Sequence, residues 1–281
     1  MKRLIVCADD FGLDPAVNEA VEQGHRHGIL STASLMVGAP AAADAVVRAQ
    51  LLPELHVGLH LVLVDGRPVS PLEEVTGLVG ADGNFHPNMA VAGFRFFFLP
   101  DIRRQLAQEI RAQYEAFRAT GLKLDHVNAH KHMHLHPTVA RLIIEIGRDY
   151  GLRAARVPAE PANVLRHAYP EERAPIPFYR PWIERLRRQQ CRAGLVVNDY
   201  VFGLAWSGKM IEQRVLRLLS YLPDGVSEMY FHPAAARSPN LIVAMPNYHH
   251  VEELETLTSA TVQARIAALG IDLSSYSALS H

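Results

Sequence analysis

Residues 4–10 read Leu-Ile-Val-Cys-Ala-Asp-Asp, an apolar run that ends in two carboxylates. A short continuous apolar run is typical of a strand that is buried on both faces of a parallel sheet. We expect a strand over residues 4–8, with Asp9 and Asp10 just past its C-terminal end. In open α/β sheets and in barrels, active sites are built at that end of the strands. The stretch therefore predicts a parallel sheet and the edge of it that carries the chemistry.

The same alternation of strand and helix continues along the chain. Asp14 is suited to cap a helix whose first residue is Pro15, and Gly24 and Gly28 follow that helix. Further strands are expected over residues 29–37, 56–63, 124–129, 152–157 and 226–231, and further helices over residues 41–51, 101–120, 138–150 and 251–269. This order predicts an α/β fold with a parallel sheet, either open or closed into a (β/α) barrel, in a single domain over residues 1–281.

Two segments interrupt the alternation and read as insertions. Residues 65–100 lack a regular period and are rich in Gly and Pro, which predicts an extended loop or lid. Residues 158–198 contain several prolines and a run of arginines. Aromatic residues gather in both, at 94–99 and at 178–182, and aromatic side chains beside basic ones suit a membrane interface or a groove for a lipid tail. Core packing or a dimer contact is the alternative for these side chains.

The composition excludes several classes of protein. The chain has 281 residues, 49% of them hydrophobic, and a formal net charge of −1, which argues against a mainly electrostatic nucleic-acid binder. Two cysteines are too few for a disulfide framework, and the N-terminal apolar run is too short for a signal peptide. We therefore expect a cytoplasmic protein. A peripheral contact with the inner membrane and a homodimer stay open.

A cluster of histidines lies within and just after the strand predicted over residues 124–129. Residues 125–136 read Asp-His-Val-Asn-Ala-His-Lys-His-Met-His-Leu-His, which places five histidines in eleven positions. Imidazole and carboxylate are the usual protein ligands of zinc-like metals. Because strand ends meet at one edge of the sheet, we expect Asp10, His60 and His130 to bind a divalent metal there.

The other histidines of the cluster have two geometric readings. If residues 130–136 are extended, alternate residues share one face, and several histidines crowd around one metal or contact the substrate. If they are helical, His130 and His134 form a pair four residues apart. We expect His132, His134 and His136 to contact the substrate or the metal ligands. Asn128 and Arg156 are assigned to the same role.

Two further residues are candidates for proton transfer. Adjacent aspartates on an extended chain point to opposite sides, so Asp10 can bind the metal while Asp9 serves as general base. The alternative for Asp9 is a cap on the following turn. His232, at the end of an apolar run, is the candidate general acid, and packing is its alternative.

The ordered motifs resemble those of the YdjC-type carbohydrate deacetylases, a family that includes the chitooligosaccharide deacetylases. The motifs are residues 5–12, residues 31–36, Gly58-Leu59-His60, the His130 cluster and Phe231-His232-Pro233. The resemblance implies a distorted (β/α) barrel and a magnesium or zinc ion held by an aspartate and two histidines. It also implies hydrolysis of the N-acetyl group of an amino sugar. The family often has three consecutive histidines where this chain has His130-Lys131-His132, which leaves the middle position open.

Within that family, the chain is most similar to the branch associated with hopanoid biosynthesis. This similarity implies an N-acetylglucosaminyl hopanoid lipid as substrate. A deacetylase of soluble N-acetylated oligosaccharides and a different metal-dependent hydrolase, such as a phosphoesterase, remain alternatives. A protein that binds metal or sugar without turnover is a third.

Overall fold

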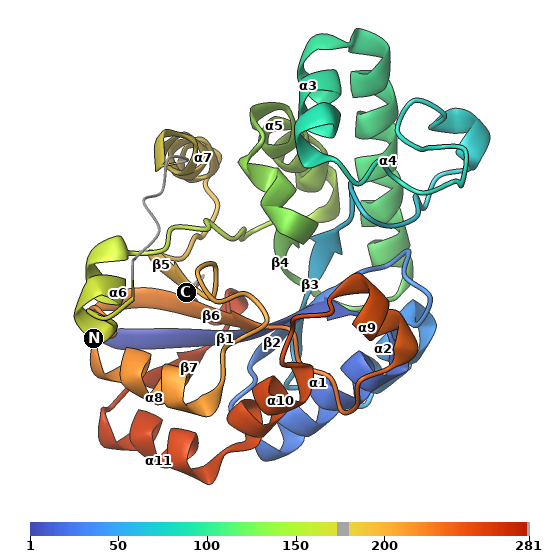
Figure 1. The fold of residues 1–281 in the computed structure, drawn as a ribbon. Helices are drawn as coiled ribbons and strands as arrows, with labels where there is room; N and C mark the ends of the chain where they lie inside the picture. Colours follow the sequence, from blue (N-terminus) through green and yellow to red (C-terminus); the bar gives the residue numbers. More distant parts are fainter. Residues whose placement is uncertain (173–179, 280–281) are drawn as a thin grey trace.

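The computed structural model describes residues 1–172 and 180–279. All its strands are parallel and join one sheet, in the order β4-β3-β2-β1-β6-β5, with β7 beside the first half of β1. The strands are β1 (Lys2–Phe11), β2 (Thr32–Leu35), β3 (His56–Leu61), β4 (Leu124–Ala129), β5 (Tyr200–Phe202), β6 (Gly225–Phe231) and β7 (Asp272–Ser274). The sheet curls into a half-barrel, which confirms the predicted α/β fold of distorted-barrel type (Figure 1).

Helices surround this sheet. They are α1 (Pro15–His27), α2 (Ala42–Gln50), α3 (Met89–Phe98), α4 (Pro100–Ala119), α5 (Pro137–Gly147), α6 (Ala162–Ala168), α7 (Arg180–Arg192), α8 (Glu212–Ser220), α9 (Pro239–Ala244), α10 (His250–Thr258) and α11 (Ala260–Ala268). Figure 1 shows α1, α2, α8, α10 and α11 on one side of β1, with α3, α4 and α5 beyond β3 and β4. The predicted cap of α1 is confirmed, because the Asp14 carboxylate accepts the backbone N–H of Ala16 at 2.9 Å.

Alternate residues of β1 face two different environments, as the period of a strand requires. Leu4, Val6 and Ala8 belong to the main apolar core, together with residues of the surrounding helices. Cys7 and Asp9, on the opposite face, are also fully or almost fully buried but lie among polar groups inside the curl of the sheet. The helices therefore stabilise the outer face of the sheet, and the inner face is left for polar chemistry.

The strand that carries the two aspartates is longer than the sequence predicts. Asp9 and Asp10 lie within β1 rather than past its end. The register between β1 and β2 shifts between Ala8 and Phe11, and Asp10 has a φ of 63°. An irregularity of this kind redirects a side chain at the end of a strand. The left-handed residue therefore breaks the strict alternation of Asp9 and Asp10.

Several predicted boundaries are wrong for identifiable reasons. The segment 65–100 is irregular only in part, because Met89–Phe98 forms α3, capped by Asn88. Residues 152–157 form two isolated bridges at Ala154 and Ala155 instead of a strand. The predicted helix over 251–269 is two helices, because Ser259 is extended and caps the second. Apolar periodicity alone detects neither the local cap nor the break.

The arginine-rich segment contains helices too. Residues 158–198 include α6 and α7, and α7 buries Ile183 and Leu186 while Trp182 remains 48% exposed. Phe178 and Tyr179, which belong to the aromatic group noted in the sequence, lie outside the described residues. Within the described ranges, no helix has both the length and the apolar character needed to cross a membrane.

Candidate functional site

A cleft of about 1020 Å³ opens at the C-terminal edge of the sheet. Its floor is made by the ends of β1, β3, β4 and β6, which supply Asp9, Asp10, His60, His130 and His232. Loops and the end of α9 add the walls, with Asp65, Asp82 and Asn84 among the polar residues and Val243, Met245 and Pro246 among the apolar ones. The predicted strand-end residues thus meet in one place.

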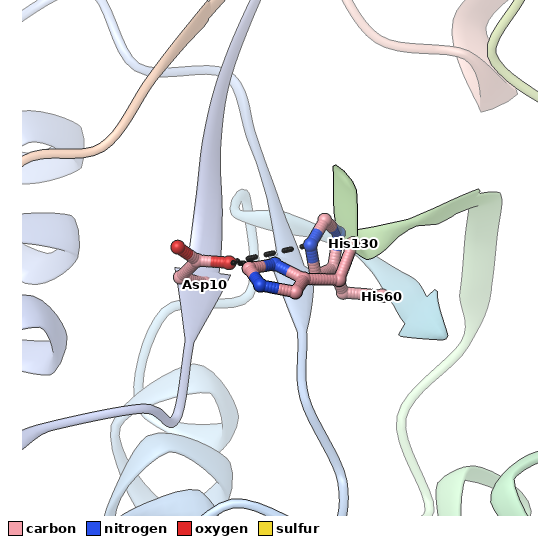
Figure 2. A group of neighbouring side chains, drawn as sticks. All are labelled: Asp10, His60 and His130. Carbon is pink, nitrogen blue, oxygen red and sulfur yellow. Dashed lines mark hydrogen bonds and ion pairs between the residues drawn. The ribbon is translucent and has the colours of Figure 1, made fainter. Parts of the chain in front are cut away.

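Asp10, His60 and His130 form a group whose ligand atoms all lie within 4.8 Å of one another (Figure 2). The Oδ1 atom of Asp10 is 3.3 Å from Nε2 of His60 and 3.2 Å from Nδ1 of His130. One carboxylate and two imidazoles make a set of three protein ligands that leaves room for water or substrate. This group is the candidate metal site.

The partner of His60 sets the orientation of its ring. His60 Nδ1–H donates to Oδ1 of Asn128 at 2.6 Å, while the Asn128 amide group donates to Asp9 and to Ser34. Because the amide donors of Asn128 are used elsewhere, its oxygen faces His60, and the lone pair of His60 Nε2 points toward Asp10. Such an outer hydrogen bond is what fixes a histidine as a metal ligand.

The unpaired atoms of the group fit a cation. Asp10 is 1% exposed, and within the described residues its Oδ2 atom has no hydrogen-bond partner, nor has Nε2 of His60. Burial alone would raise the pKa of Asp10, but His130 and His60 beside it hold that pKa well below its ordinary value. A buried carboxylate that stays charged without a full set of donors is suited to coordinate a metal ion.

Asp9 has the opposite environment. Arg156 donates to both of its carboxylate oxygens, at 2.6 and 2.9 Å, and Asn128 donates to Oδ1 at 3.0 Å. Burial acts to raise the pKa of Asp9, but the Arg156 guanidinium outweighs it and the pKa lies well below its ordinary value. Asp9 is therefore ionised and held by donors in the cleft floor. Its Oδ1 atom lies 4.0 Å from Nδ1 of His60.

Arg156 lies between two carboxylates. It is fully buried and also donates to Glu228 at 2.9 and 2.7 Å, while Glu228 accepts the hydroxyl of Tyr276 at 2.8 Å. A buried charge of this kind requires complete pairing. Arg156 and Asn128 do not line the cleft. Their observed contacts are with residues that do line it, since Arg156 donates to Asp9 and Asn128 accepts from His60.

The histidine segment is neither extended nor regularly helical. Residues 130–135 form a 3-10 turn in which Lys131 and His132 have φ values of 50° and 54°. Consequently the alternate histidines point to different places. His130 faces Asp10, His132 Nε2 lies 3.2 Å from the Tyr230 hydroxyl, and His136 packs against phenylalanines of α3. Neither of the two geometries left open by the sequence, a common face on an extended strand or a helical pair of His130 and His134, is present, because both assumed a backbone with no left-handed residues.

Burial affects the remaining histidines of the segment. It lowers the pKa of His132 to about 3 and holds the pKa of His134 well below its ordinary value, so both rings are neutral near pH 7. His134 is 2% exposed and does not line the cleft, whereas His132 does. His132 can therefore reach a bound molecule, and His134 lies behind it in edge contact, with ring centroids 5.6 Å apart.

His232 is held in the cleft by its backbone and its neighbours. Its N–H donates to Glu253, and its carbonyl accepts Nδ1–H of His250 at 2.6 Å. The ring lies edge-on to Tyr248 and Tyr230, with centroids 5.0 and 5.5 Å away. Burial lowers the pKa of His232, and within the described part of the chain its Nδ1 atom has no hydrogen-bond partner.

Sequence reasoning missed several residues of the cleft. Tyr230, Tyr248 and Ser207 line it, and the last two share a hydrogen bond of 2.9 Å. Glu228, which lies behind the cleft and pairs with Arg156, was also missed although it offers a signal, since it is a carboxylate within the apolar run 226–231 and has the same strand parity as Tyr230 and His232. Asp65 and Tyr248 lie on loops, where neither periodicity nor spacing predicts a neighbour.

Comparison with known proteins agrees with this architecture. The family described as YdjC-like protein matches residues 3–268. A carbohydrate deacetylase of Geobacillus stearothermophilus is 30% identical over 97% of this chain and 96% of its own length, and one of Mus musculus is 31% identical over 96% and 93%. Among solved structures, a putative cellobiose-phosphate cleavage protein from Enterococcus faecalis V583 has a TM-score of 0.77 at 24% identity, covering 100% of this chain and 99% of that one. The last likeness concerns the fold alone.

Proposed function

Because the chain belongs to the YdjC-like protein family, we propose that it is a metal-dependent carbohydrate deacetylase that removes the N-acetyl group of an amino sugar. The observation that carries the proposal is the pairing, in one cleft, of the Asp10–His60–His130 group with an ionised Asp9. A set of metal ligands beside an ionised carboxylate that can act as a base is typical of metal-dependent hydrolases. The names of the two full-length relatives support the substrate class.

The proposed cofactor is a divalent cation held by Asp10, His60 and His130. A bound ion would polarise the acetyl carbonyl and make a water molecule more acidic. Zinc suits a site with two imidazoles better than magnesium does, because magnesium prefers oxygen ligands. Elemental analysis of the purified protein distinguishes the two.

The side chains supply the proton transfers of the proposed reaction. Asp9 is ionised and kept in place by Arg156 and Asn128, so it can accept a proton from the attacking water. The C–O bond forms from that water, the C–N bond breaks, and the departing nitrogen gains a proton. We assign that last transfer to His232, which passes on a proton equivalent to the one that Asp9 takes from the water, so that the reaction balances. His232 lines the cleft with Asp9, and its Nδ1 atom has no hydrogen-bond partner among the described residues.

Mass spectrometry tests the activity directly. Metal-loaded protein is incubated with N-acetylglucosamine, chitooligosaccharides and an N-acetylglucosaminyl glycolipid, and each mixture is examined for loss of one acetyl group. Phosphate esters are run side by side, because turnover of these alone would support the rival phosphoesterase. Binding of every compound without turnover would contradict an enzymatic role.

A glycolipid is the substrate that we propose within this class, of the N-acetylglucosaminyl hopanoid type. Apolar residues of the cleft wall support it, since Val243 is 83% exposed and stands near Met245 and Pro246. An amino sugar that carries an apolar group would contact both the polar floor and this wall. Turnover of soluble oligosaccharides but not of the glycolipid would favour the chitooligosaccharide alternative.

The exposed aromatic face of α3 supports a peripheral contact with a membrane. Phe94, Phe97 and Phe98 are 61%, 45% and 58% exposed, whereas Phe96 is buried at 3%. We therefore propose replacing the three exposed residues by Ser and measuring binding to lipid vesicles, with Phe96→Ser as the variant expected to destabilise the fold instead. Unchanged vesicle binding in the triple variant would refute the membrane role. A single cytoplasmic domain over the whole chain, with insertions at 65–100 and 158–198, and a homodimer are the remaining expectations of this proposal.

A further inference from the structure

The non-glycine residues with a left-handed backbone conformation are concentrated at the cleft. Four non-glycine residues of the described chain have positive φ, namely Asp10 (63°), Asp65 (50°), Lys131 (50°) and His132 (54°), and all four line the same cleft. Residues other than glycine rarely adopt this conformation, and those that do are often at functional sites. The proposed metal site explains the conformation of Asp10. It does not explain Asp65 and Lys131.

These two residues form an ion pair between two segments of the cleft. Lys131 Nζ donates to Oδ2 of Asp65, and the side chains are 43% and 30% exposed. Lys131 directly follows His130, and Asp65 lies five positions after His60. A pair this exposed contributes little to folding, so it does not compensate for two residues in a disfavoured conformation. The conformation is therefore better explained by what the two side chains bind.

We propose that Asp65 and Lys131 form a subsite that binds ring hydroxyl groups of the amino sugar. A hydroxyl both donates and accepts, so it can donate to the Asp65 carboxylate and accept from the Lys131 ammonium group. The pair has no net charge, which suits a neutral polyol. A phosphate or carboxylate would meet Lys131 but be repelled by Asp65 and by Asp82, which lines the same cleft. This inference rests on the proposed function for its ligand class.

Lys131→Gly is the most informative variant, because it moves stability and binding in different directions. Glycine adopts a positive φ without strain, so the melting temperature should stay the same or rise by a few degrees. The dissociation constant of N-acetylglucosamine, titrated into metal-loaded protein, should rise about tenfold through loss of a charged hydrogen bond. In turnover, KM should rise more than kcat falls.

Two companion variants complete the experiment. Asp65→Asn keeps the size of the side chain and tolerates the left-handed conformation, so it should weaken sugar binding with little change in melting temperature. Lys123→Ala removes an exposed lysine from the turn before β4 and should leave the dissociation constant unchanged. Because Asp65 and Lys131 lie on different segments, a shared effect reports the pair and not one loop.

The alternative is that the ion pair has only a structural role, joining the segment after His60 to the segment after His130. Lys131→Gly would then lower the melting temperature and the metal content while the sugar still binds as in the wild type, and the subsite would be refuted. Absence of any N-acetylglucosamine binding by the wild type would refute it too. If the wild type binds the sugar but does not hydrolyse it, the proposed function fails, and the binding comparison still decides the subsite.

Discussion

The two buried carboxylates of the cleft floor differ in how far their oxygens are paired with hydrogen-bond donors. On the histidine side, Asp10 has imidazoles on one oxygen and, within the described residues, no partner on the other. On the arginine side, Asp9 receives three hydrogen bonds from Arg156 and Asn128. Adjacent in sequence, the two carboxylates therefore differ in what the protein leaves for a ligand to supply. In the proposed reaction Asp10 binds the cation and Asp9 accepts the proton.

Removing a histidine should have the largest effect, because it removes a proposed metal ligand from the histidine side of the cleft floor. His60→Ala or His130→Ala should lose most of the bound metal and lower turnover by more than about 100-fold, since even outer partners of a metal ligand are worth about 10- to 100-fold. Elemental analysis and the acetyl-release assay measure the two losses. His136→Ala is the matched control, because that ring packs against Phe96 and Phe97. Full metal content in His130→Ala would exclude it as a ligand.

Asp9→Asn tests the arginine side, because Asp9 is the residue proposed to accept the proton. We expect turnover to fall by about 10²- to 10⁴-fold, the usual contribution of a general base, while metal content stays near that of the wild type. The two measurements together separate the two neighbouring aspartates. If this variant retained full activity, Asp9 could not be the base.

Glu228→Gln tests the arginine side without changing a residue of the cleft, because Glu228 contacts Arg156 from behind. It leaves the buried Arg156 with one charged partner instead of two, and breaking a buried pair typically costs about 3–5 kcal/mol of unfolding free energy. Denaturant titration measures this loss. Glu172→Gln removes an exposed partner of Arg214 and should cost less than about 1 kcal/mol. Equal costs in the two variants would show that the buried network is not required.

Glu253 shows a third way to bury a carboxylate, and its effect should be confined to the pH dependence of stability. Burial raises its pKa to about 8, although the N–H groups of Met210 and His232 oppose the shift. The folded state thus holds a proton that the unfolded state releases near pH 4.5. This contribution to stability is complete below that pH and is lost as the pH rises toward about 8, at up to about 1.4 kcal/mol per pH unit.

Glu253→Gln removes that titration. Urea unfolding at about pH 5 and about pH 8 should show a smaller decrease of stability in the variant than in the wild type. The amide oxygen of Gln can still accept one of the two backbone N–H groups, so the fold should be kept. An unchanged pH profile would mean that Glu253 is charged in the folded protein.

Regular elements were the part of the fold that could be predicted. The strands β1, β2, β3, β4 and β6 and the helices α1, α2, α4 and α5 follow from apolar runs, periodicity and caps within a few residues. The failures occur where a local contact overrides the pattern. Asn88 caps α3 inside a segment that seemed irregular, and Ser259 divides a helix that seemed continuous. Both effects depend on one or two residues, which a period averaged over a window does not register.

Ligand candidates at strand ends could be predicted for the same reason. In a parallel sheet all strand ends meet at one edge, so Asp10, His60 and His130 were expected to converge, and they do. The directions of His132, His134 and His136 could not be predicted. They depend on left-handed residues at Lys131 and His132, which nothing in the residue types requires.

The sequence by itself determined the parallel sheet, the edge that carries the chemistry and the residue types that meet there, because these follow from the period of buried strands and from the position of polar residues after them. Only the tertiary structure decided how each carboxylate is compensated. Arg156 and Asn128 lie far from Asp9 in sequence, and the pairing of Asp65 with Lys131 joins a loop to the 3-10 turn after β4. Electrostatic environment depends on distance in space, and spacing along the chain does not specify that distance.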